Sequence, residues 1–440
     1  MLAQLGALAD EVPKPQQSYA IPAAEIAAFD GLLNLYDRHR YRDGTYDTTL
    51  SSIERNLRGG WTVDDDPYPT NQLLHPYQGS IYHGFARSAG LNYWESAAYA
   101  FSGSLFWEIA GETTPPSKND QVASGVAGSF LGEALFRMSN LVLERDRGPP
   151  GGWREFAAAA ISPATGFNRH AFGSRFDAVF DSRDAPYYGR LLLGSSGAIQ
   201  TRQGPSAQPE RSGLIADFAL EYGLPGKPGY SYDRPFDYFG FRVIGSSGGG
   251  IESLETRGLL YGTDYSAGGV LAGIWGLYGS YDYDAPQLFR VSSTALSLGT
   301  TAQLKLPWSM TLQGSALAGV GYAAAGTLNA PSTLDYHYGA APQVLAALRL
   351  VLGNRAALDL SARKFFVGGV DSPDERGHDN IERADVTFTL RVHGRHGIAL
   401  SYLWSQRKAS LPGFPALAQE RGTLGIFYTL LGKDGFGVAE

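Results

Sequence analysis

The C-terminal half of the chain alternates apolar and polar residues over long stretches, and this pattern constrains the fold most. Val386, Phe388 and Leu390 are apolar, whereas the residues between them are polar or charged. Successive side chains of a strand point to opposite faces, so a period of two predicts strands with one apolar face. About twelve such segments are predicted, near residues 187–200, 212–222, 236–246, 251–262, 267–281, 287–305, 308–322, 338–351, 354–367, 380–393, 396–409 and 420–431.

The polar face separates a transmembrane barrel from a soluble β-sandwich, because both folds show alternation. Several segments exceed the length of about 5–6 residues that is usual for globular strands and reach the length of about 9–11 that a bilayer requires. Charges of both signs lie in mid-strand, where a barrel has its polar lumen. The residues expected to line this lumen are Asp217, Glu221, Arg242, Arg257, Asp359, Arg363, Arg383, Asp385 and Arg391.

The composition agrees with a barrel. The chain holds 56 glycines, 25 tyrosines and 22 phenylalanines in 440 residues, and it has no run of 18 apolar residues that would form an ordinary transmembrane helix. The net charge of −7, without a basic stripe, argues against nucleic acid as a partner. Aromatic residues near strand ends predict interfacial girdles at Tyr278, Tyr281, Trp308, Tyr322, Tyr402, Trp404 and Tyr428. We therefore predict an antiparallel transmembrane β-barrel of about twelve strands over residues 185–431.

The last predicted strand resembles the assembly signal of bacterial outer-membrane proteins. Thr423, Gly425, Tyr428 and Leu430 occupy the polar, glycine, aromatic and apolar positions of that signal. The resemblance implies insertion by the barrel assembly machinery and contact with outer-membrane lipids. The tail at 432–440 departs from the pattern, since such proteins usually end on the strand itself.

The N-terminal part has the pattern of helices and loops. Helices are predicted over 21–37, 48–58, 76–89, 93–111 and 120–145, within a helical module at 21–165. Residues 1–20 form an exported segment, in which Ala7-Leu8-Ala9 is similar to a signal-peptide cleavage site; a short ordinary helix is the alternative. Ser117 and Asp120 predict a helix start.

Small residues recur within the last of these predicted helices. Ser124, Gly128 and Gly132 are spaced by four residues, so they share one face of the helix. Residues without large side chains let another helix approach closely. The sequence therefore predicts a tight helix crossing along this face.

Carboxylates within these apolar helices predict a buried polar site. Its expected members are Asn71, His75, Glu112, Asn119, Asp120 and Glu133. Glu108 and Glu112 are four residues apart, which places them on one face of a helix. Buried carboxylates need partners, and the candidates are His75, His83, Arg87 and Arg137. Structural ion pairs without further function are the alternative interpretation.

The stretch 71–84, with its two histidines, its serine and its amides, carries a family resemblance. Together with Trp107-Glu108, Glu112, Pro116-Ser117, Asn119-Asp120 and Gly132-Glu133, it resembles a family of bacterial envelope proteins known only by a domain-of-unknown-function label. The resemblance covers about residues 65–145 and implies a place in the cell envelope rather than a particular chemistry.

Enzymatic chemistry has one candidate arrangement. Ser80, His83 and Glu108 could supply a nucleophile, a base and an orienting carboxylate. Ser80 does not lie in the Gly-x-Ser-x-Gly elbow of many serine hydrolases. No metal site is predicted, because His75 and His83 are eight residues apart and lack the helical spacing of zinc enzymes. No cofactor is predicted.

Three functions follow from these features. The first is a bacterial outer-membrane barrel whose helical module fills or abuts the lumen, on the periplasmic side or inside the barrel, for transport or handling of lipids or small solutes. The second is a lipid-modifying hydrolase with its site around His75–Asp120. The third is a structural envelope protein whose helices dock a periplasmic protein.

Overall fold

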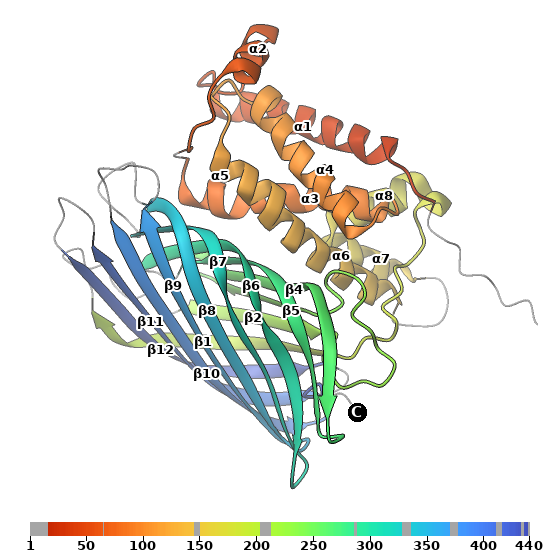
Figure 1. Cartoon of the computed structure of the whole chain (residues 1–440), viewed down its shortest axis with the longest axis vertical. Coiled ribbons are helices and arrows are strands. Elements are labelled where there is room, and N and C mark those ends of the chain that lie inside the picture. Colours follow the sequence, from red (N-terminus) through yellow and green to blue (C-terminus); the bar gives the residue numbers. More distant parts are fainter. Residues whose placement is uncertain are drawn as a thin grey trace, which may run out of the picture.

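The computed structural model describes residues 16–64, 66–144, 150–202, 213–285, 288–327, 336–369, 377–410, 416–432 and 435–438. Within them, a helical module precedes a closed β-barrel (Figure 1). The predicted cleavage site at residues 7–9 lies outside the described residues, as does part of the tail at 432–440.

The barrel is built from strands that pair in sequence order. Every pair is antiparallel, and β1 also pairs with β12, so the sheet closes without an edge. The prediction of an antiparallel barrel of about twelve strands is confirmed. The strands are β1 Tyr187–Arg202, β2 Gly213–Tyr222, β3 Phe239–Ser246, β4 Gly250–Ala267, β5 Leu271–Asp284, β6 Phe289–Leu306, β7 Met310–Thr327, β8 Tyr336–Leu352, β9 Ala356–Gly369, β10 His378–His393, β11 His396–Ser410 and β12 Leu417–Leu431.

The two faces of the wall differ as the alternation predicts. Phe388, Leu400 and Ile426 point outward, with 41%, 51% and 68% of their surface exposed. Their neighbours in the sequence, such as Thr387 and Ala399, point inward and are buried. A wall with apolar residues outside and polar residues inside is the arrangement that a bilayer requires of a transmembrane barrel.

One end of the barrel carries the tight turns at 268–270, 307–309, 353–355 and 394–395 and the start of β1; we call it the hairpin end. The chain returns to this end after β12. Phe436 is buried there against Tyr188 and Leu224, and Gln313 Nε2 donates a hydrogen bond to the carbonyl of Gly437 over 2.7 Å. The described tail residues therefore cover the lumen at the hairpin end.

The helical module contains more helix than the periodicity predicts. The two short helices α7 and α8 were not predicted individually. The elements are α1 Ala20–Tyr41, α2 Leu50–Arg58, η1 Thr70–Leu74, α3 His75–Ser88, α4 Tyr93–Phe106, η2 Trp107–Gly111, α5 Lys118–Asp120, η3 Gln121–Ala127, α6 Gly128–Glu144, α7 Gly152–Ile161, α8 Pro163–Phe172 and η4 Gly173–Arg175. Among these, η1, η2 and η3 are π-helical.

Small residues let α3 cross η3 and α6 at very short range. A Cβ atom on Gly79 would lie 1.8 Å from the carbonyl oxygen of Ser124, and one on Gly128 would lie 2.6 Å from Cα of Gly79. A Cβ atom on Gly132 would meet His83 at 2.8 Å. The close helix approach predicted from Ser124, Gly128 and Gly132 is therefore present, and α3 is the partner helix.

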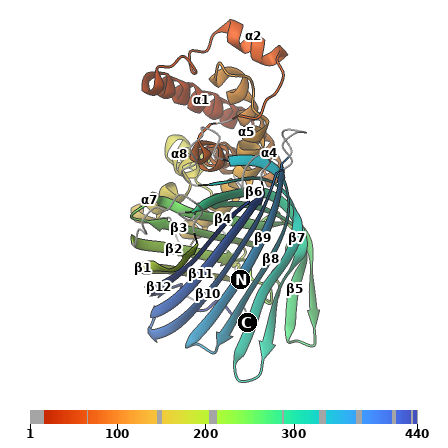
Figure 2. The ribbon, with the colours of Figure 1, turned by 90° about the vertical axis from the view of Figure 1, so that its left-hand side faces the viewer.

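The module packs on the outer wall of the barrel, above β4–β8 in Figure 1 and above the barrel in Figure 2. On β5, Tyr281 and Tyr283 point outward, and they are buried beneath the module. The ring of Tyr68 from the module contacts the rings of Tyr283 and Tyr336, with centroids 5.7 and 5.3 Å apart. The described residues of the module therefore contact the outward face of the wall, and a role of the module as a lumen plug stays a prediction.

This packing also corrects the predicted aromatic girdle. Tyr281 and Tyr322 belong to the contact with the module, where Tyr322 stacks on Tyr338. Tyr278 points into the barrel and is buried. Trp308 and Tyr428 are exposed at the hairpin end, with 88% and 44% of their surface accessible. An aromatic residue near a strand end can thus face lipid, lumen or protein, and only the tertiary structure distinguishes the three.

Among the described residues, no helix combines the length and the apolar character needed to cross a bilayer.

Candidate functional site

The three π-helical segments surround a cluster of titratable side chains, the acidic cluster, formed by His75, Glu108, Glu112 and Asp120. His75 directly follows η1, Glu108 lies in η2, and Asp120 precedes η3. A π-helical turn holds one more residue than an α-helical turn, so it redirects the side chains beside it, and such turns are frequent at functional sites. Glu112 lies beyond the end of η2 in an extended conformation, so the predicted shared helix face with Glu108 is wrong.

The carboxylates of this cluster are held by hydrogen bonds from nearby groups. Glu108 Oε2 accepts the backbone N–H of Ser117 at 2.7 Å, and Glu112 Oε1 accepts the indole N–H of Trp107 at 2.8 Å. His75 Nε2 lies 3.9 Å from Asp120 Oδ1. The cluster is therefore a preorganised group of three carboxyls and one imidazole, with few charges to balance them.

Burial governs the protonation of the acidic cluster. It raises the pKa of Glu112 and of Asp120 to about 7 each, and it raises the pKa of Glu108 well above its usual range. Burial lowers the pKa of His75. The carboxyls of Glu112 and Asp120 are therefore the members of the cluster that exchange protons near neutral pH.

A pH dependence of stability follows from these shifts. A carboxyl with a raised folded-state pKa binds more protons in the folded than in the unfolded chain, so its stabilisation is lost as the pH rises through about 7. Glu25 and Asp30, whose pKa burial raises to about 7, act in the same direction. We expect the helical circular-dichroism signal to melt at progressively lower temperature as the pH rises from about 4.5, near the ordinary pKa of a carboxyl, to about 7.

The variant Asp120→Asn is expected to reduce the fall of the melting temperature with pH, because it removes one of the titrating carboxyls. Glu54→Gln is the matched control, since Glu54 lies on the surface of α2 in an exposed pair with Arg58. Equal slopes for Asp120→Asn and the wild-type protein would contradict the assignment.

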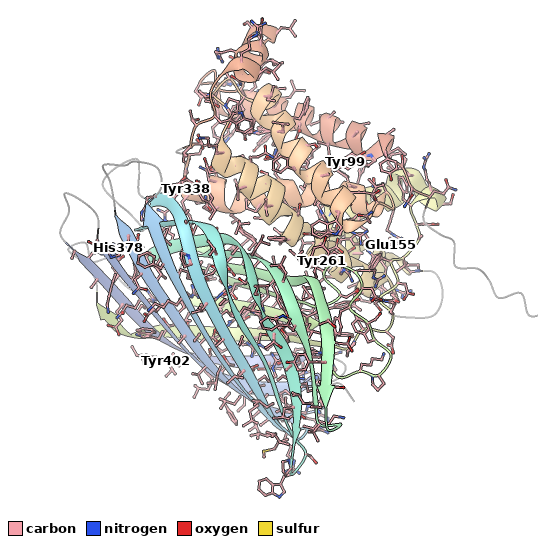
Figure 3. The ribbon with its side chains drawn as sticks, viewed as in Figure 1. Tyr99, Glu155, Tyr261, Tyr338, His378 and Tyr402 are labelled. Atoms are coloured by element: carbon pink, nitrogen blue, oxygen red, sulfur yellow. The ribbon has the colours of Figure 1, made fainter. Side chains whose placement is uncertain are left out.

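Amide side chains connect the acidic cluster to the barrel wall at Tyr338, which is labelled in Figure 3. Asn119 Nδ2 donates to Tyr338 Oη at 2.9 Å and to Asp120 Oδ1 at 3.0 Å. Gln72 Nε2 also donates to Tyr338 Oη, and Asn71 Nδ2 donates to Tyr336 Oη. The outward tyrosines of β8 therefore orient the residues beside the cluster.

A second buried group surrounds Glu133. Its carboxylate accepts hydrogen bonds from Arg87 Nε at 2.6 Å and from Arg137 Nε at 2.9 Å, and it faces His83 Nε2 at 3.1 Å. Arg137 continues to Asp237 at the hairpin end of the barrel, over 3.0 Å. Burial alone would raise the pKa of Glu133, but the two arginines and His83 hold it well below its usual range. Three of the four predicted partners, His83, Arg87 and Arg137, thus meet on one carboxylate.

The proposed serine triad is not assembled in this structure. The hydroxyl of Ser80 donates to the carbonyl of Tyr77 at 2.6 Å, whereas His83 faces Glu133. Glu108 belongs to the acidic cluster. Among the described residues, no three His, Asp or Glu side chains are arranged to hold a metal ion.

The lumen is filled by charged side chains from the inward faces of the strands. Arg190 and Arg349 both pair with Asp359, over 2.9 and 2.6 Å. Arg257 pairs with Glu221 over 2.9 Å. The structure places all nine of the predicted lumen residues on the inner face. Arg391 lies at the hairpin end, with its guanidinium 5.4 Å from the ring centre of Phe436.

Inward charges near the strand ends were missed by the sequence reasoning. These include Arg190, Asp282, Asp284, Asp379 and Arg407, which pair inside the barrel. Asp282 and Asp284 alternate with Tyr281 and Tyr283 at the end of β5, where both faces of the strand are buried, so the alternation was masked by aromatic residues. The sequence did offer one indication of their orientation. Ser280, Asp282 and Asp284 are two residues apart, so all three side chains lie on the same face of the strand.

The cavities within this charged lumen include two with volumes of about 120 and about 90 Å³. Both are lined by Arg242 and Asp385. Arg242 Nη2 lies 2.8 Å from Asp217 Oδ2, and its Nη1 lies 3.2 Å from Asp385 Oδ1. This charged triad therefore lies between the two cavities.

The helical module matches a protein family. Residues 60–164 match the family model described as a domain of unknown function, DUF3943. The matched residues include the acidic cluster and Glu133, so both buried groups lie within the segment that is similar to this family.

Comparison with solved structures finds outer-membrane proteins that match part of this chain. An outer membrane channel from Pseudomonas putida F1 is 10% identical, with 56% of this chain and 96% of that chain covered and a TM-score of 0.29. The outer membrane channel DcaP of Acinetobacter baumannii is 8% identical, with 57% and 97% covered and a TM-score of 0.25. The translocator domain of the autotransporter NalP from Neisseria meningitidis is 16% identical, with 60% and 97% covered and a TM-score of 0.25. No curated protein matches the chain.

Proposed function

We propose that this protein is a gated, narrow channel of the bacterial outer membrane for small hydrophilic solutes. The observation that carries the proposal is the pair of lumen cavities separated by the triad of Asp217, Arg242 and Asp385. A polar cavity of this size holds several water molecules. Two hydrated chambers in series, divided by one guanidinium, form a pathway with a central constriction.

The tail at the hairpin end supplies a second closure. Phe436 is 3% exposed and packs inside the ring of Tyr188, Val351 and Leu431. Arg391 stacks on its face, and Gln313 binds the backbone of Gly437. A closed state with two barriers explains how a barrel of this width can hold a charged lumen without a permanent leak.

A conductance experiment tests the channel. The variants are Arg242→Ala, which joins the cavities, Phe436→Ala, which opens the hairpin end, and the double variant. In planar bilayers, we expect the double variant to conduct more than either single variant, because both closures lie on one pathway. Arg58→Ala on α2, whose guanidinium is largely exposed, is the matched control and should conduct like the wild-type protein.

Removal of Arg242 leaves Asp217 and Asp385 without their shared guanidinium, so folding needs its own check. Combining Asp217→Asn with Arg242→Ala lessens that imbalance and gives a second variant for the same measurement. Heat-dependent mobility on denaturing gels reports whether the barrel has formed. Folded double variants that conduct no more than the wild-type protein would refute the channel.

A further inference from the structure

Helix α4 presents a continuous apolar face that the rest of the described chain does not cover. Trp94, Phe101 and Phe106 have 45%, 48% and 45% of their surface exposed, and Ala98 is exposed between them. Positions 94, 98 and 101 follow the helical spacing of one face. From Ser96 to Trp107 the sequence contains no charged residue. A helix face in water normally carries charges, so this face is built for an apolar environment.

The neighbouring helices show the contrast. Helix α2 exposes Glu54 and Arg58, and the end of α1 exposes Arg38 in a pair with Asp47. The carboxylate of Glu95, at the start of α4, is bound by the backbone N–H of Asn92 and by the hydroxyl of Tyr19. Charge on α4 is therefore confined to its first turn.

The apolar face of α4 continues directly into the outward face of the barrel. The indole of Trp94 stacks on the ring of Tyr261 in β4, with centroids 5.2 Å apart and an interplanar angle of 14°. Tyr261 is 59% exposed and pairs in register with Leu277, which pairs with Leu298 on β6. Figure 3 shows Tyr261 where the barrel meets the module. The two surfaces thus form one apolar belt across the seam.

We propose that the exposed face of α4 contacts the acyl chains of the membrane, as a lateral extension of the belt of the barrel. The outward residues of a transmembrane barrel face lipid. The exposed face of α4 is continuous with these outward residues at Tyr261, so it lies in the same lipid environment. Trp94 and Tyr261 are aromatic residues of the kind that gather at membrane interfaces. The helical module is therefore anchored beside the barrel, in contact with lipid. This inference rests on the barrel fold and is independent of conduction.

Site-directed spin labelling tests the lipid contact. The chain has no cysteine, so each introduced cysteine is labelled alone. Phe101→Cys and Ala98→Cys probe the face of α4 in the full-length protein, reconstituted into vesicles of phosphatidylethanolamine and phosphatidylglycerol. Leu400→Cys on the outward face of β11 is the lipid control, and Leu57→Cys on α2 is the water control; their side chains are 51% and 64% exposed.

Power saturation with oxygen and with a water-soluble nickel chelate gives the result. We expect labels at 98 and 101 to collide with oxygen more than with the chelate, as the label at 400 does. If the ratio of oxygen collisions to chelate collisions at 98 and 101 equals the ratio at 57, the face of α4 lies in water and the proposal is overturned. Protection of both labels from both reagents would show that a protein covers the face, which also overturns it.

Discussion

Replacement of Glu133 by glutamine is expected to lower the free energy of unfolding of the helical module by about 3–5 kcal/mol. Glu133 is completely buried, and its carboxylate is shared by Arg87 and Arg137. The variant keeps the size of the side chain but removes the negative charge, so two buried guanidinium groups lose their common counter-ion. The melting temperature of the helical circular-dichroism signal measures the loss.

Glu54→Gln is the control for Glu133→Gln, because it makes the same chemical change in a pair whose side chains are 59% and 78% exposed. An exposed pair of this kind contributes about 0.5 kcal/mol or less. Similar melting temperatures for the two variants would show that the arginines around Glu133 find other partners. That result would remove the electrostatic explanation of the site.

A single added methyl group at Gly79 is expected to cost about 1–3 kcal/mol. In Gly79→Ala, the new Cβ would stand 1.8 Å from the carbonyl oxygen of Ser124, and a backbone atom cannot rotate away as a side chain can. Helix α3 must therefore move from η3, which also shifts His83 relative to Glu133. Chemical denaturation followed by the helical signal measures the cost.

The control is the same substitution in an open helix. Gly31 lies within α1, and a Cβ atom there has no neighbour within 4 Å. Gly31→Ala is expected to stabilise the module by about 0.5–1 kcal/mol, because alanine loses less backbone entropy than glycine in a helix. A lower free energy of unfolding for Gly79→Ala together with a higher one for Gly31→Ala would establish the close crossing. Stabilisation by both would contradict it.

The buried groups of the module explain why the charged residues stood out in the sequence. Glu133 and Arg137 are one helical turn apart, and His83 and Arg87 are likewise four residues apart, so each pair lies on one helix face. Local periodicity indicates such pairs. It cannot show that both pairs meet on the same carboxylate, since that requires the crossing of α3 and α6 at Gly79 and Gly128.

The acidic cluster was predicted only in part for a similar reason. Its members follow from the unusual carboxylates at 108, 112 and 120, but their geometry depends on π-helical turns. Those turns displace Glu112 from the helix face that a spacing of four residues would assign. Their cost is compensated by tertiary contacts, such as the hydrogen bonds of Gln72 and Asn119 to Tyr338 on the barrel. Sequence spacing carries no information on these contacts.

The sequence by itself determined the strands, because the period of two is a local property of each strand and recurs along the whole C-terminal half. The length of the segments and the charges of both signs at mid-strand then favoured a barrel over a sandwich. The sequence also determined the inward charges at mid-strand, such as Arg242 and Asp385, since an apolar neighbour on each side assigns their face. Only the tertiary structure decided what the outward face meets. Leu400 is exposed on the outside of the barrel and Tyr281 faces the helical module, yet both are outward apolar positions in long strands. The hydrophobic effect has no direction, so lipid and an apolar helix satisfy the same pattern equally well.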